Sequence, residues 1–274
     1  MTMQGAMDSG KRAVQEFWDR AACGEELYLA NQQREGYAEQ ARRRYELEPV
    51  IAELAEFEAA AGQQVLEIGV GLGADHQRYA EAGARLAGVD LTERAVAHTR
   101  RRLELFGLDS VLATGDAEQL AFPADEFDSV YSWGVLHHSP DTPRAVAEVH
   151  RVLRPGGVAR IMIYHKWSLV GYMLWARYAL LRLRPWMSLR QVYARYLESP
   201  GTKAYSVAEA RRMFAAFSSV EIRTCLTHGD LLESAAGQRH RTAMLTVARA
   251  IWPRQLLKRF AASHGLFMLI RAVK

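Results

Sequence analysis

Three glycines at alternate positions, Gly69, Gly71 and Gly73, follow an apolar run with the sequence VLEI. After one helix's length of chain, a second apolar run, RLAGV, ends in Asp90. Strand, glycine turn, helix and second strand form a βαβ unit of the kind that binds nucleotides. Gly69, Gly71 and Ala74 also fit the dinucleotide fingerprint G-x-G-x-x-A, so the glycines alone do not identify the ligand.

Acidic residues at the ends of the first three predicted strands do discriminate between ligands. These residues are Glu67, Asp90 and Asp116, and in an open α/β sheet the ligand lies at the carboxyl ends of the strands. A dinucleotide would bring a pyrophosphate with about two negative charges to the first turn, where a carboxylate would repel it. S-adenosylmethionine has no phosphate, and its ammonium, sulfonium, ribose hydroxyls and adenine amine suit carboxylate acceptors. The charges therefore favour S-adenosylmethionine as the cofactor.

The order of the strands predicts a role for each part of this site. Gly69 and Gly71 would let the backbone pass close beneath the methionyl part of the cofactor, where a Cβ would intrude. Glu67 would help to place that turn or the ammonium, and Asp90 would accept hydrogen bonds from the ribose hydroxyls. Asp116 would close on the adenine edge. The full set of predicted cofactor-binding residues is Glu67, Gly69, Gly71, Asp90, Leu91, Asp116, Ala117, Ser132 and Trp133, with Ser132 and Trp133 where the methionine end and the acceptor should meet.

Apolar runs and helix signals alternate from about residue 64 onward. They predict an α/β fold with a doubly wound, mostly parallel sheet that helices cover on both faces. Thr92 is predicted to cap a helix that stops at Gly107, and Thr142 to cap the next one. Ser206 and Glu209 are predicted to form a capping box. The predicted strands are 65–70, 83–91, 110–116, 127–134, 157–164, 218–227 and 265–274, and helices are predicted in the first 60 residues and over 243–262, with a break at Pro253.

The chain resembles the class I S-adenosylmethionine-dependent methyltransferases in a series of ordered motifs over about residues 60–166. VLEIGVGLG, the acid of GVDL, GDAEQLAFPADEFDSVYSWGVLHH and VHRVLRPGG are similar to the successive motifs of that family. The nearest subgroup is the small-molecule one that includes the UbiE-like and type 11 methyltransferases. The resemblance implies a seven-stranded sheet whose last strand is inserted antiparallel beside the sixth, and cofactor contacts at Glu67, Gly69, Gly71, Asp90, Asp116 and Ala117. After the fourth strand the chain has SWGV and not the Asn-Pro-Pro-aromatic tetrad of adenine methylators, which argues against a base-flipping enzyme.

His137 and His138 follow the fourth predicted strand, close to where the transferring methyl group should lie. Methyl transfer from a sulfonium is an in-line displacement, so the protein supplies alignment, exclusion of water and, for a protonated acceptor, a base. An imidazole suits that catalytic role, and since adjacent residues point to different sides, at most one of the two is expected to serve. The predicted acceptor-binding residues are Tyr164, His165, Trp167 and Tyr172. Because Cys23 and Cys225 have no metal-ligand spacing, no metal is predicted.

The charges of the chain are divided unevenly. Residues 1–166 carry 18 Lys+Arg and 26 Asp+Glu, whereas residues 167–274 carry 17 and 5, which together give the net charge of +4. We expect a helical N-terminal cap over 1–60 and a methyltransferase domain over 61–274, with a helical insert at about 167–203. The insert is rich in aromatic residues but too short and too charged to span a bilayer. It predicts an apolar wall for a small hydrophobic or aromatic acceptor, with peripheral contact to anionic lipid as a further possibility.

The start of the chain has no apolar segment of a secretory signal, and two distant cysteines suit a reducing compartment, so a cytoplasmic location is expected. Three other functions stay open at this stage: an NAD-dependent oxidoreductase, an RNA methyltransferase, and a non-catalytic S-adenosylmethionine-binding protein. Glu67 and the acid after the third strand argue against the first. The arginines of the C-terminal part are interleaved with apolar residues of core type, which does not favour nucleic acid as a partner.

Overall fold

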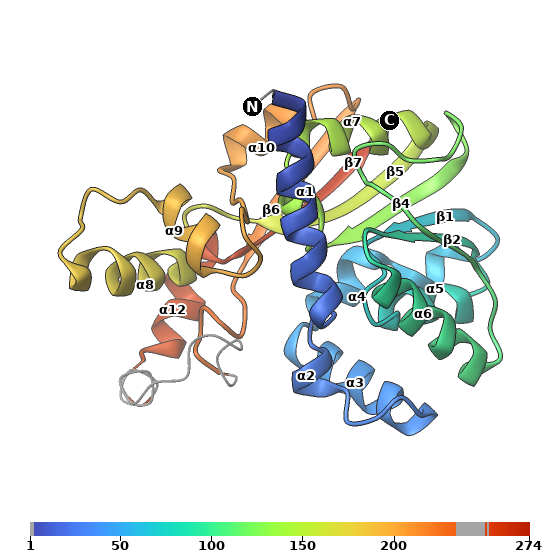
Figure 1. The fold of residues 1–274 in the computed structure, drawn as a ribbon, viewed down its shortest axis with the longest axis horizontal. Coiled ribbons are helices and arrows are strands. Elements are labelled where there is room, and N and C mark those ends of the chain that lie inside the picture. Colours follow the sequence, from blue (N-terminus) through green and yellow to red (C-terminus); the bar gives the residue numbers. More distant parts are fainter. Residues whose placement is uncertain (1–2, 234–249, 251) are drawn as a thin grey trace.

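The computed structural model, which describes residues 3–233, 250 and 252–274, has a seven-stranded sheet at its centre (Figure 1). The strands lie in the order β3-β2-β1-β4-β5-β7-β6. β1 to β5 are parallel, and β7 is antiparallel to both of its neighbours. This arrangement confirms the doubly wound sheet and the antiparallel insertion of the last strand. The strands are β1 (Gln64–Ile68), β2 (Arg85–Asp90), β3 (Val111–Thr114), β4 (Phe127–Trp133), β5 (Leu153–Tyr164), β6 (Ser219–Cys225) and β7 (Phe267–Val273).

The order of the strands fixes where a ligand can bind. From β1 the chain builds outward through β2 and β3, and it then returns to place β4 on the other side of β1. Such a reversal leaves a crevice between the two loops at the carboxyl ends of the central strands, because those loops turn to opposite faces of the sheet. The crevice therefore lies beside the glycine turn that follows β1.

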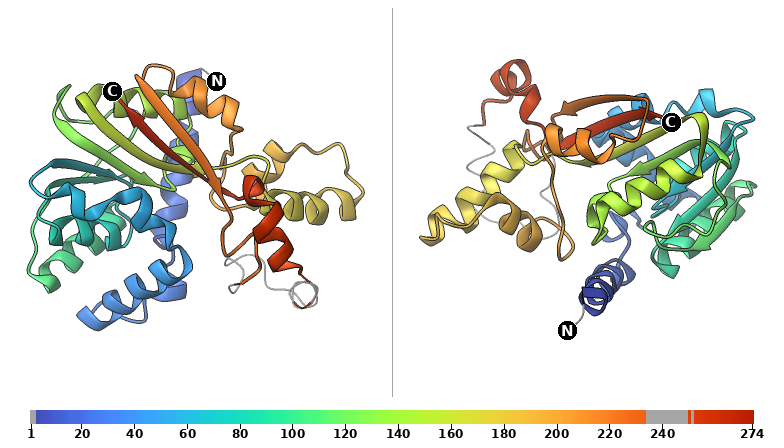
Figure 2. Two further views of the ribbon diagram at one scale, coloured as in Figure 1. Left: turned by 180° about the vertical axis from the view of Figure 1, so that it is seen from behind. Right: turned by 90° about the horizontal axis from the view of Figure 1, so that it is seen from above.

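Helices cover both faces of the sheet, and others, among them α8 and α9, extend beyond it (Figures 1 and 2). The helix predicted over 243–262 is present after Pro253, while residues 243–249 and 251 lie outside the described residues. The helices are α1 (Met3–Arg20), α2 (Glu25–Tyr28), α3 (Arg34–Leu47), α4 (Val50–Ala55), η1 (Phe57–Ala60), α5 (Ala74–Glu81), α6 (Glu93–Phe106), η2 (Leu136–His138), α7 (Thr142–Val152), α8 (Leu169–Tyr178), η3 (Leu180–Arg182), α9 (Leu189–Tyr196), α10 (Val207–Met213), α12 (Arg254–Phe260) and η4 (Ala262–His264).

Two of the three predicted helix starts are confirmed. The Thr92 side chain accepts a hydrogen bond from the backbone N–H of Ala95, and Ser206 forms a reciprocal capping box with Glu209. The third prediction is wrong, because α7 is capped by Asp141 and not by Thr142. The Thr142 hydroxyl instead donates to the carbonyl of Leu136, which leaves the adjacent carboxylate to accept the orphan N–H of the first turn.

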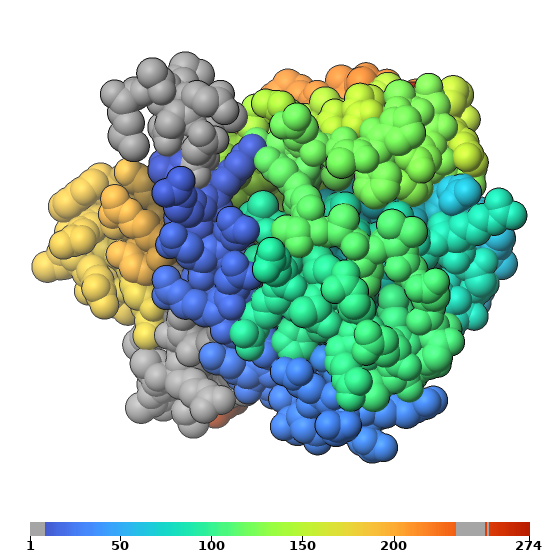
Figure 3. Space-filling view, turned by 45° about the vertical axis from the view of Figure 1, so that its right-hand side comes forward, coloured from blue at the N-terminus to red at the C-terminus, as the bar shows by residue number. Residues whose placement is uncertain are grey.

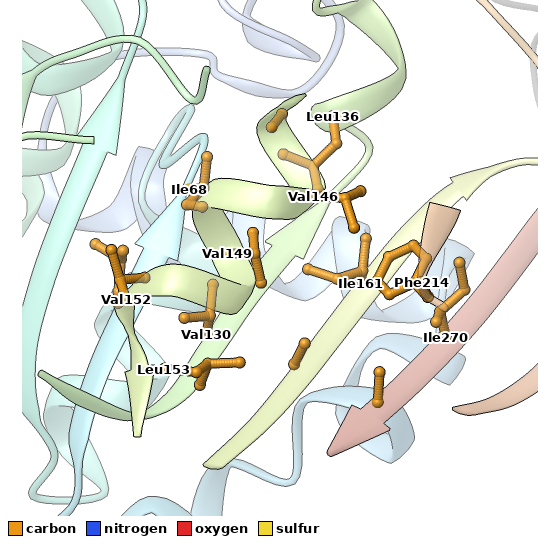
Figure 4. Close-up of a cluster of buried hydrophobic side chains, with 14 of the residues drawn as sticks. Ile68, Val130, Leu136, Val146, Val149, Val152, Leu153, Ile161, Phe214 and Ile270 are labelled. Atoms are coloured by element: carbon orange, nitrogen blue, oxygen red, sulfur yellow. The ribbon is translucent and has the colours of Figure 1, made fainter. Parts of the chain in front are cut away.

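The two faces of β1 pack against different helices. Leu66 and Ile68 point into the largest apolar cluster, together with α7 and α10 (Figure 4). Val65 points to the opposite face, into a cluster with α4, η1 and α5. Both faces of β1 are buried, which explains why most of its residues are apolar.

The N-terminal helices are held to the α/β body by a fully buried arginine. Arg102, on α6, donates to the backbone carbonyls of Leu72 and Tyr37 and to the side-chain oxygens of Gln40 and Gln77. Burial lowers the pKa of Arg102 to about 10, which leaves the guanidinium charged at neutral pH. One side chain thereby ties the glycine turn, through Leu72, to α3, through Tyr37.

The insert over 167–203 forms an arm that projects from the body (Figures 1 and 2). It contains α8, η3 and α9, which are two separate helices joined through a short turn of 3₁₀ helix. Leu174, Ala179, Met187 and Val192 form a small apolar core within it. Across the part of the chain that the structure describes, no helix combines the length and apolarity needed to span a membrane.

We expect replacement of Arg102 by Leu to lower the free energy of unfolding by at least about 3 kcal/mol, since each buried carbonyl left without a donor costs roughly 1–3 kcal/mol. Urea unfolding followed by circular dichroism measures this loss. Arg101→Leu is the matched control, because Arg101 is exposed and forms only a long ion pair with Glu104; its effect should stay within about 0.5 kcal/mol. Equal effects of the two substitutions would remove Arg102 from its proposed structural role.

Candidate active site

A cavity opens at the carboxyl ends of the central strands, beside the glycine turn. It contains about 1460 Å³ of empty space, part of it continuous with solvent. On the β1–β3 side it is lined by the glycine turn, Asp90, Asp116 and Ala117; on the β4–β7 side it is lined by Trp133, His138, Met162, Tyr164, Glu198 and Phe267.

Glycine is needed at positions 69 and 71 of the turn for two different structural reasons. Both have positive φ, 86° at Gly69 and 52° at Gly71. A Cβ at position 69 would lie 2.0 Å from a methyl group of Val135, so this glycine makes room for a protein side chain. A Cβ at position 71 would meet no atom within 4 Å, so this position faces open space. The space above Gly71 fits a ligand lying against the turn, as predicted for the methionyl part of the cofactor.

Asp90 braces the turn from the end of β2. Its Oδ2 accepts from the backbone N–H of Gly71 at 3.2 Å, and its Oδ1 accepts from the N–H and hydroxyl of Thr92. Burial raises the pKa of Asp90 above its ordinary value, against the effect of these hydrogen bonds. The carboxylate lines the cavity with lone pairs to spare. It is therefore positioned to accept from a ligand hydroxyl, as the sequence predicted for the ribose.

Glu67 lines the floor of the cavity but is not a free carboxylate. Its Oε2 lies 2.8 Å from His76 Nδ1, and His76 Nε2 lies 2.8 Å from Ser110 Oγ. The Ser110 hydroxyl donates its hydrogen to the carbonyl of Leu86, so His76 Nε2–H must be the donor to Ser110. Burial lowers the pKa of His76 to about 3 and, with the charge of Asp75, raises that of Glu67 well above normal. Glu67 is thus the neutral donor to a neutral imidazole.

The raised pKa of Glu67 bears on one step of the sequence argument. That step counted three ionised carboxylates against a pyrophosphate, and with Glu67 neutral only Asp90 and Asp116 can contribute charge. Asp116 in turn is bound by Lys11 of α1, whose Nζ lies 2.7 Å from Asp116 Oδ2 and 2.5 Å from Glu118. The electrostatic preference for a phosphate-free cofactor is consequently weaker than the sequence suggested.

α1 lies across the cofactor side of the cavity. Lys11, Val14 and Trp18 line the cavity, and Gln15 donates to the carbonyl of Leu91. Figure 3 shows α1, in dark blue, between the insert and the α/β body. The predicted residue Leu91 therefore contacts the N-terminal helix through its backbone.

His138 and Glu198 meet on the β4–β7 side of the cavity. His138 Nε2 lies 3.4 Å from Glu198 Oε2 and has no hydrogen-bond partner among the described residues. The Tyr164 hydroxyl donates to the same carboxylate at 2.8 Å. Burial, followed by the charge of Glu198, raises the pKa of Tyr164 well above normal, so Tyr164 remains a donor. His138 Nδ1 is 2.7 Å from Ser199 Oγ, and Trp18 packs edge-on against the imidazole ring.

His137 is fully buried and does not line the cavity. Its ring lies between those of His138 and Tyr164, with centroid distances of 4.3 and 4.0 Å. Burial lowers the pKa of His137 well below normal, and within the described residues neither ring nitrogen has a hydrogen-bond partner. His137, His138 and Glu198 form a group that could hold a metal ion. Each offers one ligand atom, and these three atoms all lie within 4.8 Å of one another. The sequence argument against a metal considered the cysteines and did not consider this group.

Several predicted residues lie away from the cavity. Ser132 is buried and donates to the carbonyl of Ile68, and His165 is buried with its Nδ1 3.2 Å from the carbonyl of Gly265. Trp167 and Tyr172 are exposed on the insert, where Tyr172 contacts His264 of η4. Of the predicted acceptor-binding residues, the structure brings Tyr164 to the cavity and leaves these three outside it.

Lys11, Trp18 and Glu198 line the cavity but were not singled out in the sequence. No local motif marks them, because each reaches the site through long-range packing. Glu198 is nevertheless the first acidic residue after Lys166, at the end of an insert that is otherwise without acids. That isolation was a usable signal.

The fold and the cavity define a doubly wound nucleotide-binding domain with a ligand cavity at the carboxyl ends of its central strands. Residues 66–161 match a protein family described as "Methyltransferase domain". Over this stretch the chain is similar to the class I S-adenosylmethionine-dependent methyltransferases, whose methyl donor is S-adenosyl-L-methionine. The resemblance inferred from the ordered motifs is thus confirmed.

Two curated methyltransferases are similar to part of this chain. A phosphatidylethanolamine N-methyltransferase from Cereibacter sphaeroides is 37% identical over 100 residues, which are 36% of this chain and 49% of that protein. A demethylmenaquinone methyltransferase from Tropheryma whipplei is 30% identical over 153 residues, 54% of this chain and 63% of that protein. This chain therefore spans less than two thirds of these curated relatives. The crystal structure of the [4+2]-cyclase SpnF is 19% identical, with a TM-score of 0.54 over 86% of this chain and 81% of that one, and shares the fold.

The protonation state of Glu67 predicts different effects at two acidic positions. We expect Glu67→Gln to keep its affinity for S-adenosylhomocysteine, because a carboxamide N–H can also donate to His76 Nδ1. Asp90→Asn should lose about ten- to a hundredfold in affinity, since a hydrogen bond to a charged acceptor is worth roughly 1.5–3 kcal/mol. Isothermal titration calorimetry measures both. If Glu67→Gln lost as much affinity as Asp90→Asn, Glu67 would instead be an ionised ligand of the cofactor ammonium.

Proposed function

We propose that this chain transfers a methyl group from S-adenosylmethionine to an oxygen, nitrogen or carbon atom of a small hydrophobic or aromatic acceptor. The observation that carries the proposal is the unpartnered Nε2 of His138, which faces Glu198 at 3.4 Å on the side of the cavity away from the glycine turn. A buried imidazole nitrogen without a partner is unfavourable unless a ligand completes it.

The chain's own residues would position and deprotonate the acceptor. S-adenosylmethionine, when bound, supplies an electrophilic methyl carbon. With its Nδ1–H donating to Ser199 Oγ, His138 presents a lone pair on Nε2 and can take the proton that the acceptor loses. Glu198 would stabilise the resulting imidazolium, and the Tyr164 hydroxyl holds that carboxylate in place. Of the two histidines, His138 is the one we assign as the base, and His137 as its packing neighbour.

The lining of this side of the cavity supports an acceptor with a substantial apolar part. Its side chains are mostly aromatic or thioether groups, with carboxylates at Glu48 and Glu198 and a thiol at Cys23. The relatives from C. sphaeroides and T. whipplei are named for phosphatidylethanolamine and demethylmenaquinone. Both compounds join a small reactive head to long apolar chains. We infer an acceptor of that general construction for this chain.

Formation of S-adenosylhomocysteine tests the proposed reaction. The protein is incubated with S-adenosylmethionine and either phosphatidylethanolamine or a reduced demethylmenaquinone in detergent micelles, and the product is measured by mass spectrometry. We expect methylation of one probe class well above a reaction without acceptor. Tight binding of S-adenosylhomocysteine without turnover of either probe would instead favour a binding protein, and micromolar affinity for NAD without affinity for S-adenosyl compounds would overturn the cofactor assignment.

Substitutions at the proposed base should change turnover more than cofactor binding. General-base catalysis contributes roughly 10²–10⁴-fold, so His138→Ala should lower kcat by about a hundredfold or more, and Glu198→Gln by a smaller factor. Affinity for S-adenosylhomocysteine should stay unchanged in both. Glu58→Gln, which changes an exposed carboxylate distant from the cavity, is the control.

Two outcomes would contradict this assignment of His138. An unchanged kcat in His138→Ala would remove it from the mechanism. Loss of activity after dialysis against EDTA, with recovery on addition of a divalent ion, would assign His137, His138 and Glu198 to a metal site instead.

A further inference from the structure

The exposed apolar side chains of the molecule are concentrated outside the α/β body. Among the described residues, nine large apolar side chains are exposed, and six of them lie on the insert. Two more lie on α12, and Val111, on the edge strand β3, is the ninth. An exposed apolar side chain in isolation needs no explanation, but a contiguous group marks an interaction surface.

The insert reaches its greatest exposure in the segment LLRLRPW, residues 180–186, which we call the tip segment. Every residue of the tip segment is exposed, and Leu183 and Trp186 are 83% and 79% exposed. Leu183 also has a φ of 54°, in the left-handed region that disfavours any residue with a Cβ. The fold gains little burial from this leucine, and glycine would adopt the same backbone conformation at lower cost.

The apolar side chains of the tip segment are not needed to hold the insert together. The core of the insert is formed by Leu174, Ala179, Met187 and Val192, and Trp175 donates from its indole to the carbonyl of Met187. Ser188 begins α9 with a complete capping box. The insert is therefore built as a folded unit that carries Leu180, Leu181, Leu183 and Trp186 outward.

The charged residues on both sides of the tip segment in the sequence are all basic. From Trp167 to Leu197 there are five arginines and no acidic residue. Arg182, Arg184, Arg190 and Arg195 are exposed, and within the described residues none of the five forms an ion pair. An apolar tip surrounded by unpaired arginines is complementary to a surface that offers anionic groups above an apolar layer.

We propose that the tip segment docks on the surface of a bilayer that contains anionic phospholipid. Leu181, Leu183 and Trp186 would enter the boundary between head groups and acyl chains, where tryptophan is favoured. The flanking arginines would bind lipid phosphates, which attract basic residues within a Debye length of the surface. Docking would be peripheral and reversible.

The insert connects the docking surface to the acceptor side of the cavity. It leaves the sheet just after Tyr164, at the end of β5, and returns through Glu198, which accepts the hydrogen bond of the Tyr164 hydroxyl. A membrane-bound tip would therefore hold this side of the cavity near the bilayer. This link to a lipid-borne acceptor rests on the proposed function, whereas the docking itself does not.

Co-sedimentation of the full chain with vesicles tests the docking without donor or acceptor. The vesicles contain phosphatidylcholine alone or mixed with phosphatidylglycerol, at low and at physiological salt. We expect binding to the mixed vesicles that weakens with salt. A variant carrying Leu181→Ser, Leu183→Gly and Trp186→Ser should bind at least tenfold more weakly, with its thermal midpoint unchanged. Val111→Ser, which removes an exposed apolar side chain from the edge strand β3, should bind like the natural chain.

Three results would overturn the proposal. The first is equal binding by the triple variant and the natural chain, and the second is no binding to mixed vesicles at low salt. The third is a natural chain that is dimeric by light scattering and a triple variant that is monomeric, with neither bound to vesicles; the tip segment would then be an interface between two copies. Failure of the methyl-transfer assay, in contrast, would leave the vesicle result unchanged.

Discussion

The geometry of the cavity depends on the hydrogen bonds that the guanidinium of Arg102 donates. It is fully buried, yet it must stay charged to satisfy two backbone carbonyls and two amide oxygens at once. One of those carbonyls belongs to Leu72, within the glycine turn, and the other to Tyr37, on α3. The Arg102 guanidinium consequently holds both the cofactor side of the cavity and the N-terminal helices in place. A hydrophobic side chain in its place could fill the volume but could not supply the donors.

A second buried charge connects α3 to the centre of the sheet. Asp75, at the start of α5, accepts two hydrogen bonds from Arg44 and one each from the hydroxyls of Tyr45 and Tyr131. Burial opposes ionisation, but the charge of Arg44 and these donors outweigh it and lower the pKa of Asp75. The negative charge of Asp75 in turn helps to keep Glu67 protonated. Ionisation at the floor of the cavity is thus decided by the whole cluster, and a neutral Glu67 follows from its neighbours.

The sequence predicted well what depends on local pattern. The seven strands, the cap at Thr92, the capping box at Ser206 and the glycine turn all follow from period, turn chemistry and short motifs. It predicted less well what depends on distant partners. Glu67 looked like an ionised ligand because His76 and Asp75 could not be placed against it, and Glu198 was missed because 60 residues of chain separate it from His138 in sequence but not in space.

The uneven division of charge along the chain becomes a division in space. Acidic residues of the first 166 positions are largely engaged by partners: Glu25 binds Arg94, and Asp75 binds Arg44. Arginines of the insert have no acidic partner within reach among the described residues and lie at the surface of the arm. Unpaired like charges on one small folded unit repel one another and slightly destabilise it. Cation–π contacts of Arg177 and Arg182 with Tyr178 compensate part of that cost, and an anionic surface at the tip segment would compensate more of it.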